Sequence, residues 1–172
     1  MRFVITGEWN RNTLLRVIVL FFLFYSFAFW LTNFGLYFFK MGLTYQSVVD
    51  YYRGSAEQFT QPRSLLGLLE VSHFHLFAMG IFLVTLTHLL LFVPVKTPLK
   101  LALIVSAFTS AFLDEMSSWL VRFVSPLFAY LKIGSFVVLQ ASLLVTIILA
   151  TWAVLTMKPS AYTDSNARPR QG

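Results

Sequence analysis

Two apolar stretches of the sequence contain side chains that can bind metal ions or move protons. Glu70, His73 and His75 lie in the segment LLEVSHFHLFAMG, at the start of the first stretch. Asp114 and Glu115 interrupt the second. Imidazole and carboxylate groups serve as metal ligands and as general acids and bases. Which of these groups can meet depends on the helices that carry them.

Helical spacing distributes the three histidines of the chain over two faces of one helix. At about 100° per residue, Glu70, His73 and His88 fall on one face, whereas His75 falls on another face near Met79. The HFH triplet therefore directs one imidazole to each side. It does not predict a pair of ligands that point in one direction.

A neighbouring antiparallel helix is expected to bring the carboxylates close to these histidines. A helix that starts near residue 97 returns Asp114 and Glu115 to about the height of His75. Arg122 follows Glu115 by two helical turns and is expected to pair with a carboxylate there. The sequence thus predicts one polar layer made of Glu70, His73, His75, Asp114 and Glu115.

Haem b is the first of three interpretations of this layer. Neutral imidazole ligates haem iron, and a membrane haem is held between helices. His73 and His88 are 15 residues apart on nearly one face, which resembles the paired histidines of cytochrome b helices. The resemblance implies cofactor ligands among His73, His75 and His88, with Met79 or a histidine of a second chain as the partner ligand.

A metal or proton site is the second interpretation, and a structural role is the third. Glu70 and His73 form a Glu-x-x-His step, and Asp114 and Glu115 would complete a carboxylate-rich metal set. The same groups would also serve as a proton relay. In the third interpretation, Asp114, Glu115 and Arg122 form a structural ion pair near a helix end, where snorkelling lowers the cost of burying charge.

The elements that must position these groups are membrane helices. The 172 residues are 58% hydrophobic and 12% charged, whereas soluble domains have roughly 25% charged residues. Four apolar runs exceed or approach the roughly 20 residues that cross a bilayer; they are residues 17–39, 73–95, 99–121 and 133–157. We predict an all-α integral membrane protein with four transmembrane helices and a short interfacial helix, TYQSVVDYYRG, between helices 1 and 2.

The domain organisation and orientation follow from the same pattern. We expect one four-helix transmembrane domain over residues 1–160 and a disordered polar tail over 161–172. Four spans put eight Lys and Arg residues on the side of the two termini and five on the other side. This multi-pass topology with cytoplasmic termini agrees with the positive-inside rule. It also accounts for the net charge of +6 without nucleic acid.

Several function classes are excluded or disfavoured. The chain has no cysteine, so it has no disulfide, thiolate metal site or iron-sulfur ligand. No activated nucleophile or P-loop is present, so we expect no catalytic activity of its own. We predict an accessory membrane subunit, in an electron-transfer complex with haem b or a metal, that packs on lipid and on other subunits or its own copies. The alternative is a small proton or ion transporter that uses the carboxylate and histidine relay.

Overall fold

The computed structural model describes residues 13–156, and all five α-helices found there are joined by short connections or one longer loop. The predicted tail at 161–172 lies outside the described residues. The elements are α1 (Thr13–Lys40), α2 (Tyr45–Arg53), α3 (Leu65–Leu90), α4 (Thr97–Phe123), the 3₁₀ turn η2 (Pro126–Phe128) and α5 (Ala129–Thr156).

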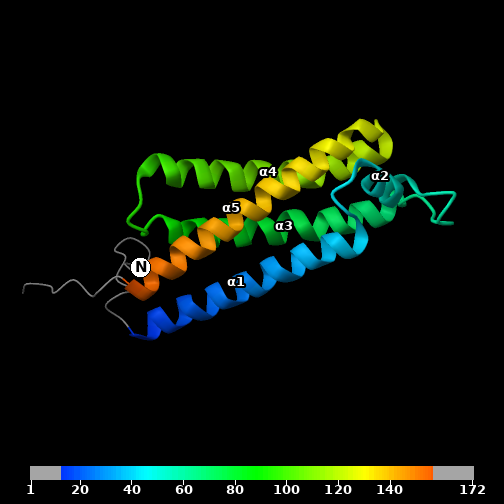
Figure 1. Cartoon of the computed structure of the whole chain (residues 1–172). Coiled ribbons are helices and arrows are strands. Elements are labelled where there is room, and N and C mark those ends of the chain that lie inside the picture. Colours follow the sequence, from blue (N-terminus) through cyan, green and yellow to red (C-terminus); the bar gives the residue numbers. More distant parts are fainter. Residues whose placement is uncertain (1–12, 157–172) are drawn as a thin grey trace, which may run out of the picture.

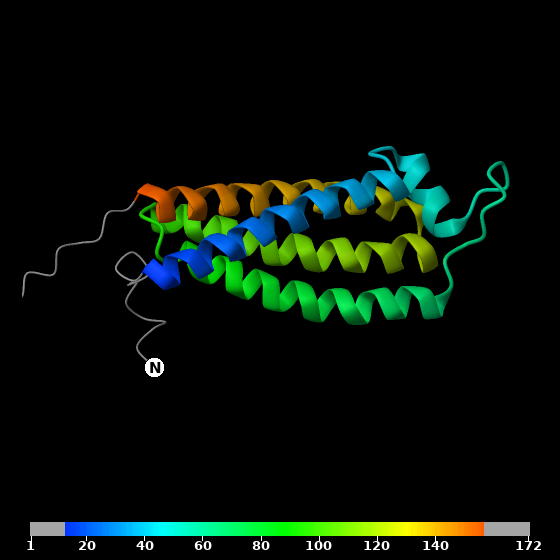
Figure 2. The same cartoon turned by 90° about the horizontal axis from the view of Figure 1, so that it is seen from below.

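The four long helices lie side by side as an antiparallel bundle, and α2 sits across one end of it (Figures 1 and 2). We call this end the α2 end. The helix α5 contacts α1, α3 and α4. In the most apolar stretch of α5, 50% of the residues are buried, whereas the corresponding share is 17% in α1 and in α3. The helix α5 is therefore the centre of the bundle, and α1 and α3 expose most of their surface.

Three helices among the described residues are long and apolar enough to cross a membrane: α1, α3, and α5 with η2. The chain is therefore a membrane protein. The predicted third span corresponds to α4, which has 27 residues but contains the adjacent carboxylates Asp114 and Glu115. That α4 is a fourth transmembrane span remains a prediction.

Helix α3 begins at Leu65, eight residues before the apolar run 73–95 that the sequence predicts as the second span. The reason is local, because the Ser64 hydroxyl accepts a hydrogen bond from the Gly67 amide at 3.0 Å and caps the helix. Side-chain caps of this kind satisfy amide groups that have no partner within the helix. Residues 62–64 therefore belong to the loop that links α2 to α3.

Helix α2 is fixed at both of its ends. The Thr44 side chain caps its first turn, and Gly54 ends it with a φ of 81°. A Cβ at Gly54 would lie 2.6 Å from the Thr60 carbonyl oxygen, so this position needs glycine both for its backbone conformation and for space. The turn that follows is closed by an antiparallel bridge between Ser55 and Thr60.

Two apolar clusters hold the bundle together. The larger one runs along the helices away from the α2 end and includes Leu83, Leu86, Leu143 and Ile147. The smaller one lies under α2 and includes Val48, which is fully buried. The outer surfaces of α1 and α3 remain covered with exposed apolar side chains, as expected for helices in contact with lipid or other apolar helices.

Candidate functional site

A buried ion pair joins α4 to α5 near the α2 end. The Lys132 ammonium lies 2.9 Å from Oδ2 of Asp114 and donates a second hydrogen bond of 2.9 Å to the Asp114 backbone carbonyl. Only 5% of Lys132 is exposed. An ion pair that is buried away from water stabilises a fold only when its remaining polar atoms are also hydrogen-bonded. The side chains around Asp114 meet this requirement only in part.

The surroundings of Asp114 satisfy its backbone carbonyl but not its whole carboxylate. Ser117 and Ser118 also donate to the carbonyl, at 2.7 and 3.3 Å. The Tyr52 hydroxyl is in turn 2.8 Å from the Ser118 hydroxyl, which ties α2 to the pair. The second carboxylate oxygen, Oδ1 of Asp114, is buried and has no hydrogen-bond partner among the described residues. This oxygen remains free to accept a hydrogen bond.

Glu115 belongs to a second polar network, between α3 and α4. The Trp119 indole donates to the Ser72 hydroxyl at 2.8 Å, and Ser72 donates to Oε1 of Glu115. Nδ1 of His75 lies 3.8 Å from the other oxygen, Oε2. The Glu115 side chain is 12% exposed and that of His75 is 47% exposed. Glu115 is thus the inner member of the pair and His75 the outer member.

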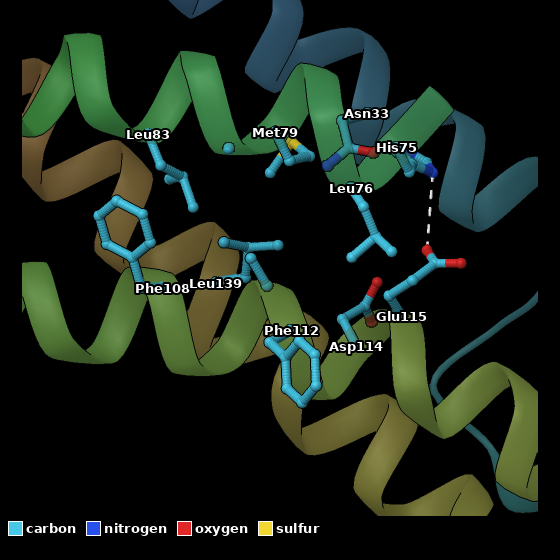
Figure 3. Close-up of a pocket in the computed structure, with 12 residues that line it drawn as sticks. Asn33, His75, Leu76, Met79, Leu83, Phe108, Phe112, Asp114, Glu115 and Leu139 are labelled. Atoms are coloured by element: carbon cyan, nitrogen blue, oxygen red, sulfur yellow. Dashed lines mark ion pairs between the residues drawn. The ribbon is translucent and has the colours of Figure 1, made fainter. Parts of the chain in front are cut away.

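A cavity of about 190 Å³ lies between α3 and α4 next to these networks. Figure 3 shows His75 on α3 facing Glu115 on α4, with apolar side chains such as Phe108 and Phe112 along the walls. We call this space the central cavity. The full lining is Asn33, His75, Leu76, Met79, Gly80, Leu83, Phe108, Ala111, Phe112, Asp114, Glu115 and Leu139.

Asn33 is the contribution of α1 to the central cavity. Its side-chain amide has no hydrogen-bond partner within the described residues, and its side chain is only partly exposed. An amide supplies both donors and an acceptor. The cavity therefore combines apolar walls with a few polar groups that retain bonding capacity, which is the usual composition of a small-molecule site.

Two further hollows share lining residues with the central cavity. The end cavity, of about 420 Å³, opens at the α2 end and shares His75, Asp114 and Glu115 with the central cavity. The lateral groove, of about 380 Å³, lies between α1 and α3 and shares His75 and Met79 with it. His75 thus lines all three hollows.

The site lies in a part of the chain that resembles a known family. Residues 42–161 match the model of the Aq_1264_TM family, which is described as a transmembrane helical domain. The chain belongs to this family. No curated protein and no solved structure matches it. The matched range of this Aq_1264_TM member contains His75, Asp114, Glu115 and Lys132, whereas Asn33 precedes it.

The structure of this Aq_1264_TM member brings together only part of the predicted polar layer. His75, Met79, Asp114 and Glu115 meet at the central cavity. Glu70 and His73 are exposed on α3 and line none of the three hollows, and the ring of His73 instead contacts that of Phe74. Half-buried His88 contacts Phe92, nearer the other end of the bundle.

The predicted metal set is therefore not assembled. Within residues 13–156, no group of three or more histidine, aspartate or glutamate side chains is placed to hold a metal ion. The set of Glu70, His73, Asp114 and Glu115 is divided because the first two residues lie outside the hollows that contain the carboxylates. The helical spacing that separates His73 from His75 on α3 is the physical reason.

The cation that pairs with the carboxylates is Lys132, and the expectation of Arg122 was wrong. Nε of Arg122 donates to the Arg63 backbone carbonyl at 2.8 Å, so Arg122 fastens the loop before α3. Lys132 is one of the five basic residues that the sequence predicts on the side opposite the termini, but it lies buried in the first turn of α5. Lys132 stands just before an apolar run, and this position is the sequence signal that could have identified it. In the structure it is buried on α5 together with Ser135 and Phe136.

Tyr52 gives the α2 attachment a dependence on pH. Burial raises the pKa of this phenol above its usual value of 10.0. The neutral phenol is therefore favoured in the folded state, and its contribution to stability is complete below pH 10 and is lost as the pH rises through the raised pKa. In Tyr52→Phe the decline above pH 10 should be shallower by up to about 1.4 kcal/mol per pH unit. Unfolding curves in detergent at several alkaline pH values measure this, and identical slopes for the two proteins would contradict it.

Proposed function

We propose that the chain is an accessory membrane subunit that exchanges protons between the surface at the α2 end and the interior of the membrane, with Glu115 and His75 as the exchanging groups. The observation that supports this most directly is their position. Glu115 and His75 line the end cavity and the central cavity together, and His75 also lines the lateral groove. A carboxylate next to an imidazole is a pair that transfers protons near neutral pH.

The neighbouring groups suit this role. Ser72 donates a hydrogen bond to Glu115 and accepts one from Trp119, which fixes the carboxylate opposite His75. Asp114 already has Lys132 as its counter-ion at 2.9 Å, so its charge is compensated. Glu115 has no comparable fixed cation in the described residues, and its nearest ionisable partner is the His75 imidazole at 3.8 Å.

The one-sided access favours a subunit over a transporter that works alone. The three hollows include no α3 residue beyond Leu83. Past this point the core contains Leu86, Leu90 and Leu143, which are at most 1% exposed. A complete proton path to the other surface would need polar groups or water through this apolar core. We infer that the onward acceptor is another molecule, either in the bilayer or in a partner subunit.

Electron transfer through haem b would be a more specific role for the proposed accessory subunit. All three histidines of the chain lie on α3, so a haem held between helices would need its second imidazole from another chain. His73 is exposed and lines none of the three hollows, so it is the histidine best placed to meet a partner. An oxidised-minus-reduced absorption spectrum of the complex purified with its partners tests this form.

Infrared difference spectroscopy on the protein in lipid bilayers tests proton exchange. We expect a carboxyl band that appears in the difference spectrum between two pH values and that disappears in Glu115→Gln. The matched control is Glu70→Gln, because Glu70 is exposed on α3 near the α2 end and lines none of the three hollows. A carboxyl signal that is unchanged in Glu115→Gln, or one that Glu70→Gln removes instead, would overturn the assignment.

A further inference from the structure

The lateral groove lies on the side of the bundle next to the central cavity and shares two lining residues with it. Its α1 wall contains Tyr25 and Phe29, which are 68% and 38% exposed, and its α3 wall contains Ala78 and Phe82. At its polar end it reaches His75 and Met79, which also line the central cavity. A molecule dissolved in the membrane would thus meet an apolar groove that leads to a hydrogen-bonding site.

The polar groups of the central cavity determine which kind of head group such a molecule would need. His75 and Asn33 supply N–H donors, while the Glu115 carboxylate, whose side chain is 12% exposed, supplies acceptor oxygens. Lys132 does not line the central cavity, so no cation that could bind an anionic head lies there beside the two carboxylates. Donors for a carbonyl and acceptors for a hydroxyl together favour a neutral head that can do both.

The size of the central cavity agrees with a single ring. Its volume of about 190 Å³ exceeds the roughly 150 Å³ of a protein cavity that is known to hold benzene. The side chains of Phe108 and Phe112 line the same space (Figure 3), and aromatic side chains pack favourably against another ring. The larger lateral groove would accommodate an apolar tail.

We propose that the central cavity and the lateral groove bind a lipid-soluble quinone or quinol, with its ring between His75, Asn33 and Glu115 and its tail between α1 and α3. This proposal rests on the proposed proton exchange, because the ring oxygens would take up two protons beside Glu115 and His75 when a redox subunit of the same complex supplies two electrons to the quinone, and would release them when that subunit oxidises the quinol. A quinone carbonyl accepts hydrogen bonds and a quinol hydroxyl also donates them, so both forms match the groups around the cavity.

The test uses decylubiquinone, a quinone ring with a ten-carbon tail, and the full chain in nanodiscs of neutral phosphatidylcholine. Quenching of tryptophan fluorescence is the readout, because Trp119 is hydrogen-bonded to the Ser72–Glu115 network. We expect saturable quenching that is weakened about tenfold, the equivalent of one good hydrogen bond or a blocked contact, in Asn33→Leu and in Ala78→Leu. Dodecanol, which has the tail without the ring, should not compete.

The matched control for Ala78→Leu is Ala102→Leu, because Ala102 is exposed on α4 and lines none of the hollows. Circular dichroism reports whether each variant is folded, and Asn33→Leu tests the site from a different helix. Quenching that does not saturate, equal quenching in Ala78→Leu and wild type, or displacement of the quinone by dodecyltrimethylammonium but not by a second quinone would each overturn the proposal.

The two proposals fail in different ways. If the infrared signal of Glu115 is present and decylubiquinone does not bind, the quinone proposal is wrong and proton exchange stands. If decylubiquinone binds as expected but the Glu115 signal is absent, the site holds the ring and the proposed proton exchange is wrong.

Discussion

Replacing Lys132 with methionine is expected to destabilise the protein by about 3–5 kcal/mol, because the change leaves the Asp114 carboxylate buried without its counter-ion. The ammonium also donates to the Asp114 carbonyl, so Lys132→Met removes two hydrogen bonds as well as a charge. The effect should appear as unfolding at a lower fraction of denaturing detergent, and as weaker association of the ends of α4 and α5 that meet near α2.

Two comparisons separate the lost ion pair from other effects of Lys132→Met. The double variant Lys132→Met with Asp114→Asn should regain most of the lost stability, since it removes both buried charges and keeps similar side-chain volumes. Lys40→Met is the control for loss of a lysine, because Lys40 is exposed at the end of α1, and it should change stability by no more than about 0.5 kcal/mol. Equal stability of Lys132→Met and Lys40→Met would show that the buried pair contributes nothing.

The lengths of the apolar runs in the sequence were sufficient to predict the helices. The predicted runs at 17–39, 73–95 and 133–157 correspond to α1, α3 and α5, each long and apolar enough to span a membrane. Run length alone determines this, because a helix is the simplest way to pair every backbone group in lipid. The helix boundaries were less accurate. Caps such as Ser64 act through one side chain and change the hydropathy pattern very little.

The separation of His75 from His73 on α3 also followed from helical spacing, because the angle between two residues on one helix is fixed by their separation. The partners of those residues did not follow from the sequence. Lys132 pairs with Asp114 because α5 crosses α4 at that height, and Asn33 reaches the central cavity because α1 packs on α5. Such contacts depend on how three helices are arranged, which the spacing within one helix does not specify.

The small residues of α4 illustrate the same limit. Ala102, Ser106, Ser110 and Asp114 recur every four residues, a pattern that predicts a stripe of close helix contact. The stripe is only partly an interface: the Ser106 hydroxyl lies 2.8 Å from that of Ser142 on α5 and Ser110 is buried, but Ala102 is exposed. Ala107, outside the stripe, is 1% exposed in the core cluster that contains Leu83 and Leu143.

Ala107→Leu is therefore expected to destabilise the bundle, whereas Ala102→Leu should not. The larger side chain at position 107 has no free space in the core, and overpacking of this kind costs typically about 1–3 kcal/mol. At position 102 the added atoms would lie on the exposed surface of α4, where the expected change is within about 0.5 kcal/mol. Unfolding of the two variants by denaturing detergent, measured side by side with wild type, gives the comparison. Greater destabilisation in Ala102→Leu would mean that the exposed stripe, rather than the face that contains Ala107, forms the close contact of α4.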